Sequence, residues 1–105
     1  MIQIQFQTKS SDLRTMTITG HADSSPYGQD LVCCAVSAIA LSSLNAIDEL
    51  YPEACSLSAA NNRIELKVEH NSSALQTSLR TIEKQLLAMA LQYPEYIRME
   101  TCSKS

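Results

Sequence analysis

The residues best suited to chemistry in this chain gather in one window, residues 20–34. The window holds both glycines of the chain, one of its two histidines, His21, and two of its four cysteines. Glycine serves where the backbone takes a positive φ or must bend freely, so Gly20 and Gly28 predict a loop with two flexible points. An imidazole at one end of such a loop and the Cys33 thiol at the other are suited to act as base and nucleophile in covalent catalysis.

Cys33 is expected in the first turn of a helix. Asp is a favoured N-cap, and Asp30 precedes an apolar run that extends to about residue 50. Free backbone N–H groups and the positive end of the helix dipole at that position would raise the thiolate fraction of a cysteine. His21 would accept the thiol proton and then protonate the leaving group. Ser37 lies four residues beyond Cys33 on the same helix face, where its hydroxyl could orient the thiol or the histidine.

The same residues also permit other interpretations. A cysteine in an apolar helix is often a small core residue, so a non-enzymatic peptide-binding module with a structural Cys33 stays open. The adjacent Cys33 and Cys34 point to a thiol redox or transfer enzyme, which is disfavoured because neighbouring cysteines close a strained ring. Candidate metal ligands are few and the vicinal thiols are poorly arranged to chelate together. The sequence therefore predicts neither a metal nor an organic cofactor.

Size and composition are typical of one soluble domain. The 105 residues can form a core without disulfides, and 45% of them are hydrophobic. A formal net charge of −3 argues against direct binding of nucleic acid, which needs a basic surface. Residues 1–7 alternate in polarity, unlike a secretory signal, so the expected location is the reducing cytoplasm, with free thiols. The apolar run 31–47 is short and interrupted by polar residues, and predicts a core helix rather than a membrane span.

Hydrophobic periodicity predicts seven elements of secondary structure. Alternation of apolar and polar residues predicts five strands, at residues 2–7, 15–19, 54–59, 64–70 and 96–102. Helical spacing predicts two helices, at residues 31–50 and from residues 71–73 to Pro94. Ser73 and Gln76 match a capping box, and Asn61 and Asn62 suit the turn of the second hairpin. The order ββαββαβ predicts an α+β fold in which one mostly antiparallel sheet packs with two helices, in a single domain over residues 1–105.

The window resembles the motif of the ribosomal-processing cysteine protease family of bacteria. That motif consists of Gly-His-Ala, a short loop, Gly-x-Asp-[Ile/Leu]-Val-Cys and a serine four residues after the cysteine. Here residues 20–22, 28–33 and Ser37 match it, with eleven residues between the histidine and the cysteine. The element order and Tyr93-Pro94 before the last strand also agree. The main departure is Cys34, where the family usually has alanine.

The resemblance implies a cysteine endopeptidase, a thiol-dependent hydrolase of peptide bonds. Its implied substrate is the N-terminal extension of a large-subunit ribosomal protein, so its activity supports ribosome assembly. Such extensions carry consecutive aromatic residues before the cut. His21 is then the general acid and base, and Cys33 the nucleophile. The family tends to form homodimers, and a homodimer is expected here. The alternative is a non-enzymatic peptide- or ribosome-binding module in which Cys33 is structural.

The resemblance also implies roles for residues around the catalytic pair. Asp30 and Ser37 match supporting positions of the motif. Gly20 and Gly28 flank a mobile loop that covers the site, and they are expected to act as its hinges. Tyr27 lies in that loop and is a candidate contact for the aromatic residues of the substrate.

Overall fold

The computed structural model describes the backbone of residues 1–20 and 27–104, with the side chains of residues 1–20 and 31–103. Within these residues the elements follow in the order ββαββαβ. They are β1 (Ile2–Lys9), β2 (Asp12–Thr19), α1 (Tyr27–Leu50), β3 (Cys55–Ala60), β4 (Arg63–Val68), α2 (Ser73–Gln92) and β5 (Ile97–Lys104). The predicted element order is therefore confirmed.

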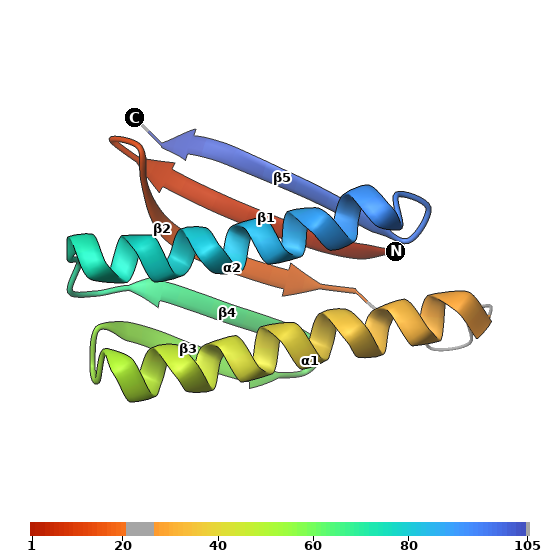
Figure 1. Cartoon of the computed structure of the whole chain (residues 1–105), viewed down its shortest axis with the longest axis horizontal. Coiled ribbons are helices and arrows are strands. Elements are labelled where there is room, and N and C mark those ends of the chain that lie inside the picture. Colours follow the sequence, from red (N-terminus) through yellow and green to blue (C-terminus); the bar gives the residue numbers. More distant parts are fainter. Residues whose placement is uncertain (21–26, 105) are drawn as a thin grey trace.

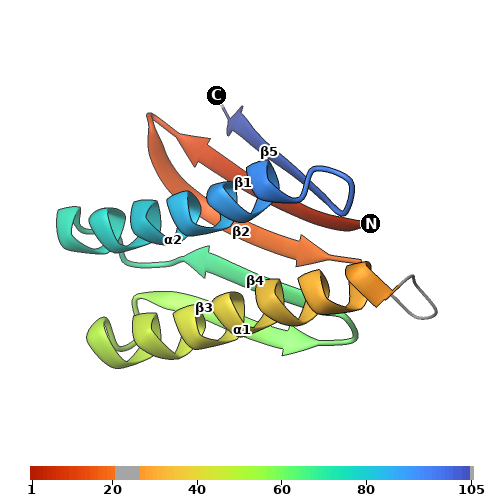
Figure 2. The ribbon, with the colours of Figure 1, turned by 45° about the vertical axis from the view of Figure 1, so that its right-hand side comes forward.

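The described strands form one five-stranded sheet with the order β3-β4-β2-β1-β5. Three of the four strand pairs are antiparallel, and β5 runs parallel to β1. Both helices lie across the same face of this sheet, α1 over the β3–β4 side and α2 towards β1 (Figures 1 and 2). The predicted fold class, an α+β sandwich of one mostly antiparallel sheet and two helices, is confirmed.

Alternation along the strands explains why the helices cover only one face. Ile2, Ile4 and Phe6 are at most 2% exposed, whereas the glutamines between them lie on the other face. The helices complete the core with apolar residues at spacings of three and four. The buried residues contributed by α1 are Val32, Val36, Ala40, Ser43, Leu44 and Ile47. By length and hydropathy α1 would pass as a membrane span, but it packs on the sheet as the predicted core helix.

Helix α1 begins four residues earlier than the sequence predicts. Its first residue is Tyr27, so Asp30 lies inside the helix and the prediction of Asp30 as the N-cap is wrong. Gly28 likewise lies in the first helical turn rather than in a loop. A glycine costs a helix only about 1 kcal/mol relative to alanine. The long apolar stripe that α1 buries against the sheet offsets that cost, so Gly28 does not stop the helix.

Helix α2 is capped one residue earlier than predicted. The Ser72 side chain accepts a hydrogen bond from the Leu75 N–H at 3.1 Å, so Ser72 is the N-cap and the capping box of Ser73 and Gln76 is wrong. The Gln76 amide instead accepts from the Leu13 N–H and donates to the Leu13 carbonyl, both at 2.8 Å. Long-range pairing of Gln76 with the β2 backbone thus replaces the predicted local bond, and it ties α2 to the sheet.

Candidate active site

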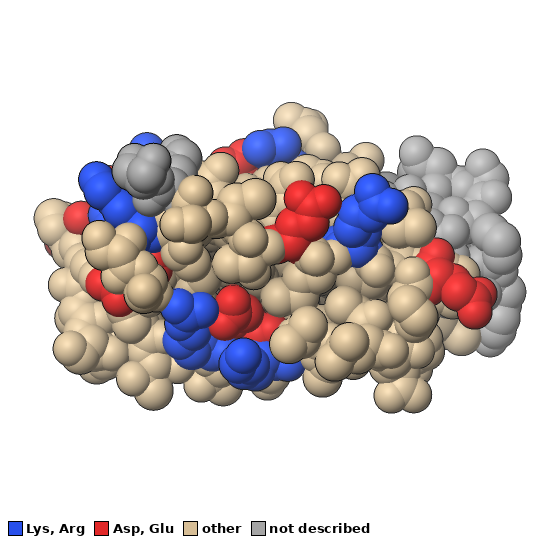
Figure 3. All heavy atoms as spheres, turned by 90° about the horizontal axis from the view of Figure 1, so that it is seen from above, with Lys and Arg blue, Asp and Glu red and all other residues tan. Residues whose placement is uncertain are grey.

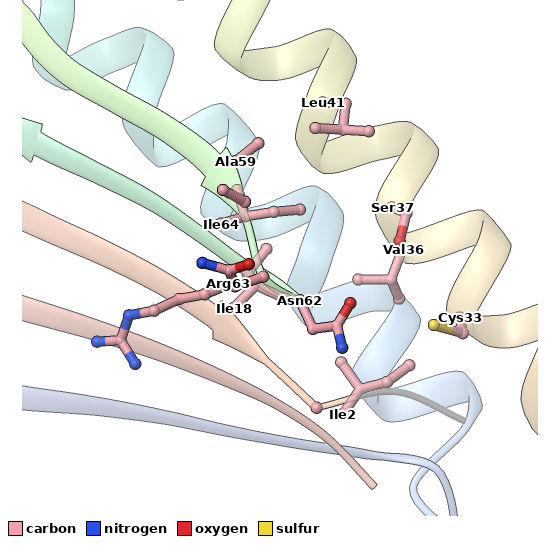
Figure 4. Close-up of a pocket in the computed structure, with 13 residues that line it drawn as sticks. Ile2, Ile18, Cys33, Val36, Ser37, Leu41, Ala59, Asn62, Arg63 and Ile64 are labelled. Atoms are coloured by element: carbon pink, nitrogen blue, oxygen red, sulfur yellow. The ribbon is translucent and has the colours of Figure 1, made fainter. Parts of the chain in front are cut away.

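A groove of about 350 Å³ opens between α1 and the turn that joins β3 to β4 (Figure 4). Its lining residues Ile2, Ile18 and Gly20 belong to the start of β1 and the end of β2, which lie at one end of the molecule near the start of α1 (Figures 1 and 2). Its floor is apolar and includes Ile2, Ile18 and Ile64. The groove therefore offers apolar surface below and polar groups along its rim, an arrangement typical of a site for a small molecule or an extended peptide.

One wall of the groove is a row of α1 side chains spaced four residues apart. Cys33, Ser37 and Leu41 form this row, which confirms that the predicted nucleophile and Ser37 share a helix face. Cys33 is half-buried and packs against the edge of the core, and its Sγ points into the groove (Figure 4). The thiol is thus supported by packing while its sulfur faces the space that a substrate would occupy.

The Ser37 hydroxyl differs from the other serine hydroxyls of α1. Ser42 donates to the Ala38 carbonyl at 2.7 Å, and Ser43 donates to the Ile39 carbonyl at 2.6 Å. Ser37 makes no such bond with any residue that the structure describes, although it lies on the same helix. Its hydroxyl is therefore available on the groove side, next to Cys33.

Gly20 is required by the geometry at the end of β2. Its φ is +79°, a conformation that costs little only for glycine. A Cβ placed on Gly20 would lie 2.4 Å from the Met1 carbonyl oxygen, well inside van der Waals contact. Gly20 also lines the groove, and His21 is the residue bonded directly to it. His21 itself and the side chains of Tyr27 and Asp30 lie outside the described residues.

The start of α1 at Tyr27 changes the expected electrostatics of the thiol. Cys33 is the seventh residue of the helix and lies in its second turn. The free N–H groups and the favourable dipole effect are confined to the first turn. The predicted activation of Cys33 by the helix entrance is therefore wrong in this structure. Activation of the thiol then depends on a base that removes its proton, and His21 is the candidate.

The remaining cysteines occupy different surroundings. All four cysteines are free. Cys34 and Cys102 are exposed and line none of the groove. Burial, and secondarily the negative charge of Glu69, raises the pKa of the Cys55 thiol above its ordinary value, so Cys55 is a poor nucleophile at neutral pH. Among the described side chains, no three His, Cys, Asp or Glu residues gather closely enough to hold a metal ion.

Together these features define a class of protein. A half-buried thiol on a core helix, directed into a groove with an apolar floor and a polar rim, is the arrangement of an enzyme that attacks its substrate through sulfur. The groove has an apolar floor and polar residues on its rim, which suits a peptide with apolar side chains. The fold and the site thus define a cysteine peptidase.

Comparison with known proteins identifies the family. The sequence profile of the family described as cysteine protease Prp matches residues 1–98, and the chain belongs to this family. The ribosomal processing cysteine protease Prp of Staphylococcus aureus is 34% identical over 83 residues, which cover 76% of this chain and 78% of that protein. The predicted resemblance is confirmed, and the chain is a cysteine protease. The binding-module and redox alternatives are therefore not retained.

Solved structures agree with this assignment. The crystal structure of an essential ribosomal processing protease Prp from S. aureus in complex with a substrate peptide matches with a TM-score of 0.87 and 26% identity, over 96% of this chain and 99% of that chain. A second crystal structure of that protease, with a covalently linked product peptide, matches with a TM-score of 0.84 and 27% identity over the same shares.

Some groove residues carried no functional prediction. Leu41 and Ile2 line the groove, but in the sequence they are indistinguishable from other core residues of a helix and a strand. Asn62 also lines it and was expected only as a turn residue. The sequence did contain a sign that Asn62 is unusual. The second residue of a tight two-residue hairpin turn is most often glycine, and here it is asparagine.

Proposed function

We propose that this protease removes the N-terminal extension of a large-subunit ribosomal protein and so supports ribosome assembly. The observation that carries the proposal is the Cys33 sulfur, which faces a groove with an apolar floor in a member of the cysteine protease Prp family. The names of the S. aureus relatives, which specify ribosomal processing, support this substrate class. An extension with consecutive aromatic residues would place apolar side chains on the floor that Ile2, Ile18 and Ile64 provide.

The proposed reaction has two steps. The Cys33 thiol transfers its proton to His21, and its sulfur attacks the scissile carbonyl carbon. His21 then protonates the departing amine as the C–N bond breaks, which leaves the peptide as a thioester on Cys33. In the second step His21 takes a proton from water, the hydroxide attacks the thioester, and the Cys33 sulfur leaves. Cys33 is the nucleophile and His21 the general acid and base in both steps.

Supporting roles are proposed for the residues around this pair. The free Ser37 hydroxyl on the groove wall orients the thiol or the imidazole, and Asp30 occupies the other supporting position of the family motif. Tyr27 packs against an aromatic residue of the substrate. Gly20, with its positive φ, is the point at which the backbone changes direction between β2 and the loop when substrate binds.

The proposed cellular setting is a cytoplasmic homodimer that works on protein rather than on nucleic acid. No charged residue occurs between Leu31 and Ile47, and Leu31 and Ala38 are exposed, so the outer side of α1 is an uncharged surface of the kind found at interfaces. The face drawn in Figure 3 mixes basic and acidic side chains, in keeping with a net charge of −3. One core cluster draws on every described element except β3, whose Cys55 and Leu57 pack against it, and this supports a single domain over residues 1–105.

Incubation with a peptide tests the proposed substrate. The peptide copies the N-terminal extension and the first mature residues of the host's own large-subunit ribosomal protein, and mass spectrometry reads the products. The expected result is one cut, after the aromatic residues. A matched peptide with those aromatic residues changed to alanine should be cut far more slowly. Equal cutting of the two peptides, or no cutting of either, would contradict the proposed substrate.

A further inference from the structure

The wall of the groove opposite Cys33 is the tight turn between β3 and β4. Ala60 pairs with Arg63 across the hairpin, and the two residues between them, Asn61 and Asn62, have φ values of +54° and +62°. Positive φ at both central residues is the conformation of a type I′ turn, whose twist matches that of the flanking strands. The turn is therefore a tight connection within the hairpin, and it places Asn62 on the rim of the groove.

The Asn62 side chain extends into the groove. Figure 4 shows its carboxamide directed towards the space between Ile2 and Cys33, whereas Arg63 extends away from α1. Asn62 is exposed, and its carboxamide makes no hydrogen bond with the residues that the structure describes. Glycine at this position would adopt the same φ at lower conformational cost. The sequence thus keeps a polar side chain at a place where backbone geometry alone favours having none.

A peptide lying in this groove has a specific need for such a group. Every residue of an extended peptide presents one N–H and one carbonyl that lose water when the peptide is buried. The floor of Ile2, Ile18 and Ile64 has no side-chain polar group to replace that water. A carboxamide both donates and accepts hydrogen bonds, so Asn62 can pair with the N–H and the carbonyl of a peptide backbone. Such pairing is independent of the peptide's side chains.

We infer that Asn62 binds the main chain of the peptide substrate across the groove from Cys33 and sets the position of the scissile carbonyl relative to the sulfur. Its NH₂ group donates to a peptide carbonyl, and its oxygen accepts from a peptide N–H. Cys33 then attacks the peptide from one side of the groove, and Asn62 positions the peptide by hydrogen bonds from the other side. The inference rests on the proposed function in that the ligand is a peptide, but it does not depend on which protein supplies that peptide.

Three variants isolate the carboxamide. Asn62→Gly removes it and keeps a residue that favours positive φ. Asn62→Asp keeps the size and the turn preference but replaces the donating NH₂ with a second acceptor oxygen. Asn61→Gly makes the same asparagine-to-glycine change one residue earlier in the turn. Asn61 also lines the groove, so this variant is the matched control for whether the effect belongs to the Asn62 carboxamide in particular. Thermal unfolding of each variant checks the turn itself, and the Tm of Asn62→Gly should equal or exceed that of the unmodified chain.

The measurement compares two reagents that both modify Cys33. An acetylated tetrapeptidyl chloromethyl ketone ending in phenylalanine carries a peptide backbone, and methyl methanethiolsulfonate carries none. Mass spectrometry of the intact protein gives each rate, and peptide mapping confirms Cys33 as the modified residue. Asn62→Asp removes one of the two hydrogen bonds and should slow the peptidyl reagent roughly five- to tenfold, the effect of about 1 kcal/mol or slightly more. Asn62→Gly removes both hydrogen bonds and should slow it by at least as much. Asn62→Gly should leave the methanethiolsulfonate rate unchanged. In Asn62→Asp the methanethiolsulfonate rate reports the effect of the added negative charge on the Cys33 thiol, and the peptidyl rate is compared after division by it.

Several results would overturn the inference. The peptidyl reagent could react with Asn62→Gly as fast as with the unmodified chain, or both reagents could slow equally. Equal slowing in Asn61→Gly would also refute a specific role of Asn62. Failure of the proposed function would give a result distinct from failure of this inference. The unmodified chain would leave the ribosomal extension uncut, but its reaction with the peptidyl reagent would still depend on Asn62.

Discussion

Replacement of Gly20 by alanine should destabilise the protein by about 2–3 kcal/mol, from two separate causes. An alanine held at the observed φ of +79° costs about 1–2 kcal/mol. The new methyl group would also lie 2.4 Å from the Met1 carbonyl oxygen, so the start of β1 must move. That end is anchored, because Ile2 is 1% exposed and its N–H donates to the Tyr96 carbonyl at 2.9 Å. Weakening that hydrogen bond adds about 1 kcal/mol.

The second glycine provides a matched control with the opposite sign. Gly28 lies in the first turn of α1 with helical backbone. Alanine is a better helix former than glycine by roughly 0.5–1 kcal/mol. Gly28→Ala should therefore stabilise the protein slightly, although the chemical change is the same as in Gly20→Ala.

Thermal and urea unfolding followed by circular dichroism measure both effects. For a domain of this size Gly20→Ala should lower the Tm by roughly 10 °C, and Gly28→Ala should raise it by a few degrees. An unchanged Tm for Gly20→Ala would refute the argument from positive φ and close approach. A lower Tm for Gly28→Ala would contradict the start of α1 at Tyr27.

Two further predictions concern the α2 cap and the half-buried thiol. Ser72→Ala should cost about 1 kcal/mol in urea unfolding because it removes the N-cap bond, whereas Ser73→Ala should be nearly neutral; equal losses would contradict the assignment of Ser72 as the cap. Glu69→Gln should lower the pKa of Cys55 because it removes the nearby negative charge, although burial keeps that pKa above its ordinary value. The pH profile of Cys55 alkylation measures this shift, and an unmoved profile would contradict the cause. Because the folded-state pKa is the higher one, Cys55 contributes stability that is lost as pH rises through the alkaline range, and Glu69→Gln should reduce that loss.

The sheet could be predicted from the sequence because burial of one face imposes a period of two. Ile2, Ile4 and Phe6 must all lie on one face, and a shift by one residue would expose all three. The second hairpin was also predictable, because Asn61 and Asn62 tolerate the positive φ that its turn requires. The parallel pairing of β5 with β1 was harder to predict from the sequence. It depends on the path that the chain takes over α2 and not on a local sequence pattern.

The errors arose where local signals competed with long-range contacts. Asp30 is a good N-cap in isolation, yet α1 starts at Tyr27. Gln76 suited a capping box, but it binds the Leu13 backbone, a partner 63 residues away in the chain. The groove could not be predicted for a similar reason. Its walls come from α1 and the turn at Asn62, which only the folded sheet brings together.

The central claim is that the Cys33 sulfur, and no other thiol, performs the cleavage. The most direct test compares Cys33→Ala with Cys34→Ala on the ribosomal extension peptide, with the Tm of each variant measured alongside. Both cysteines are adjacent on α1, but only Cys33 lines the groove, whereas Cys34 is exposed to solvent. Cys33→Ala should abolish cleavage and keep the fold, and Cys34→Ala should retain most of the activity. Cleavage that survives in Cys33→Ala and disappears in Cys34→Ala would contradict the account.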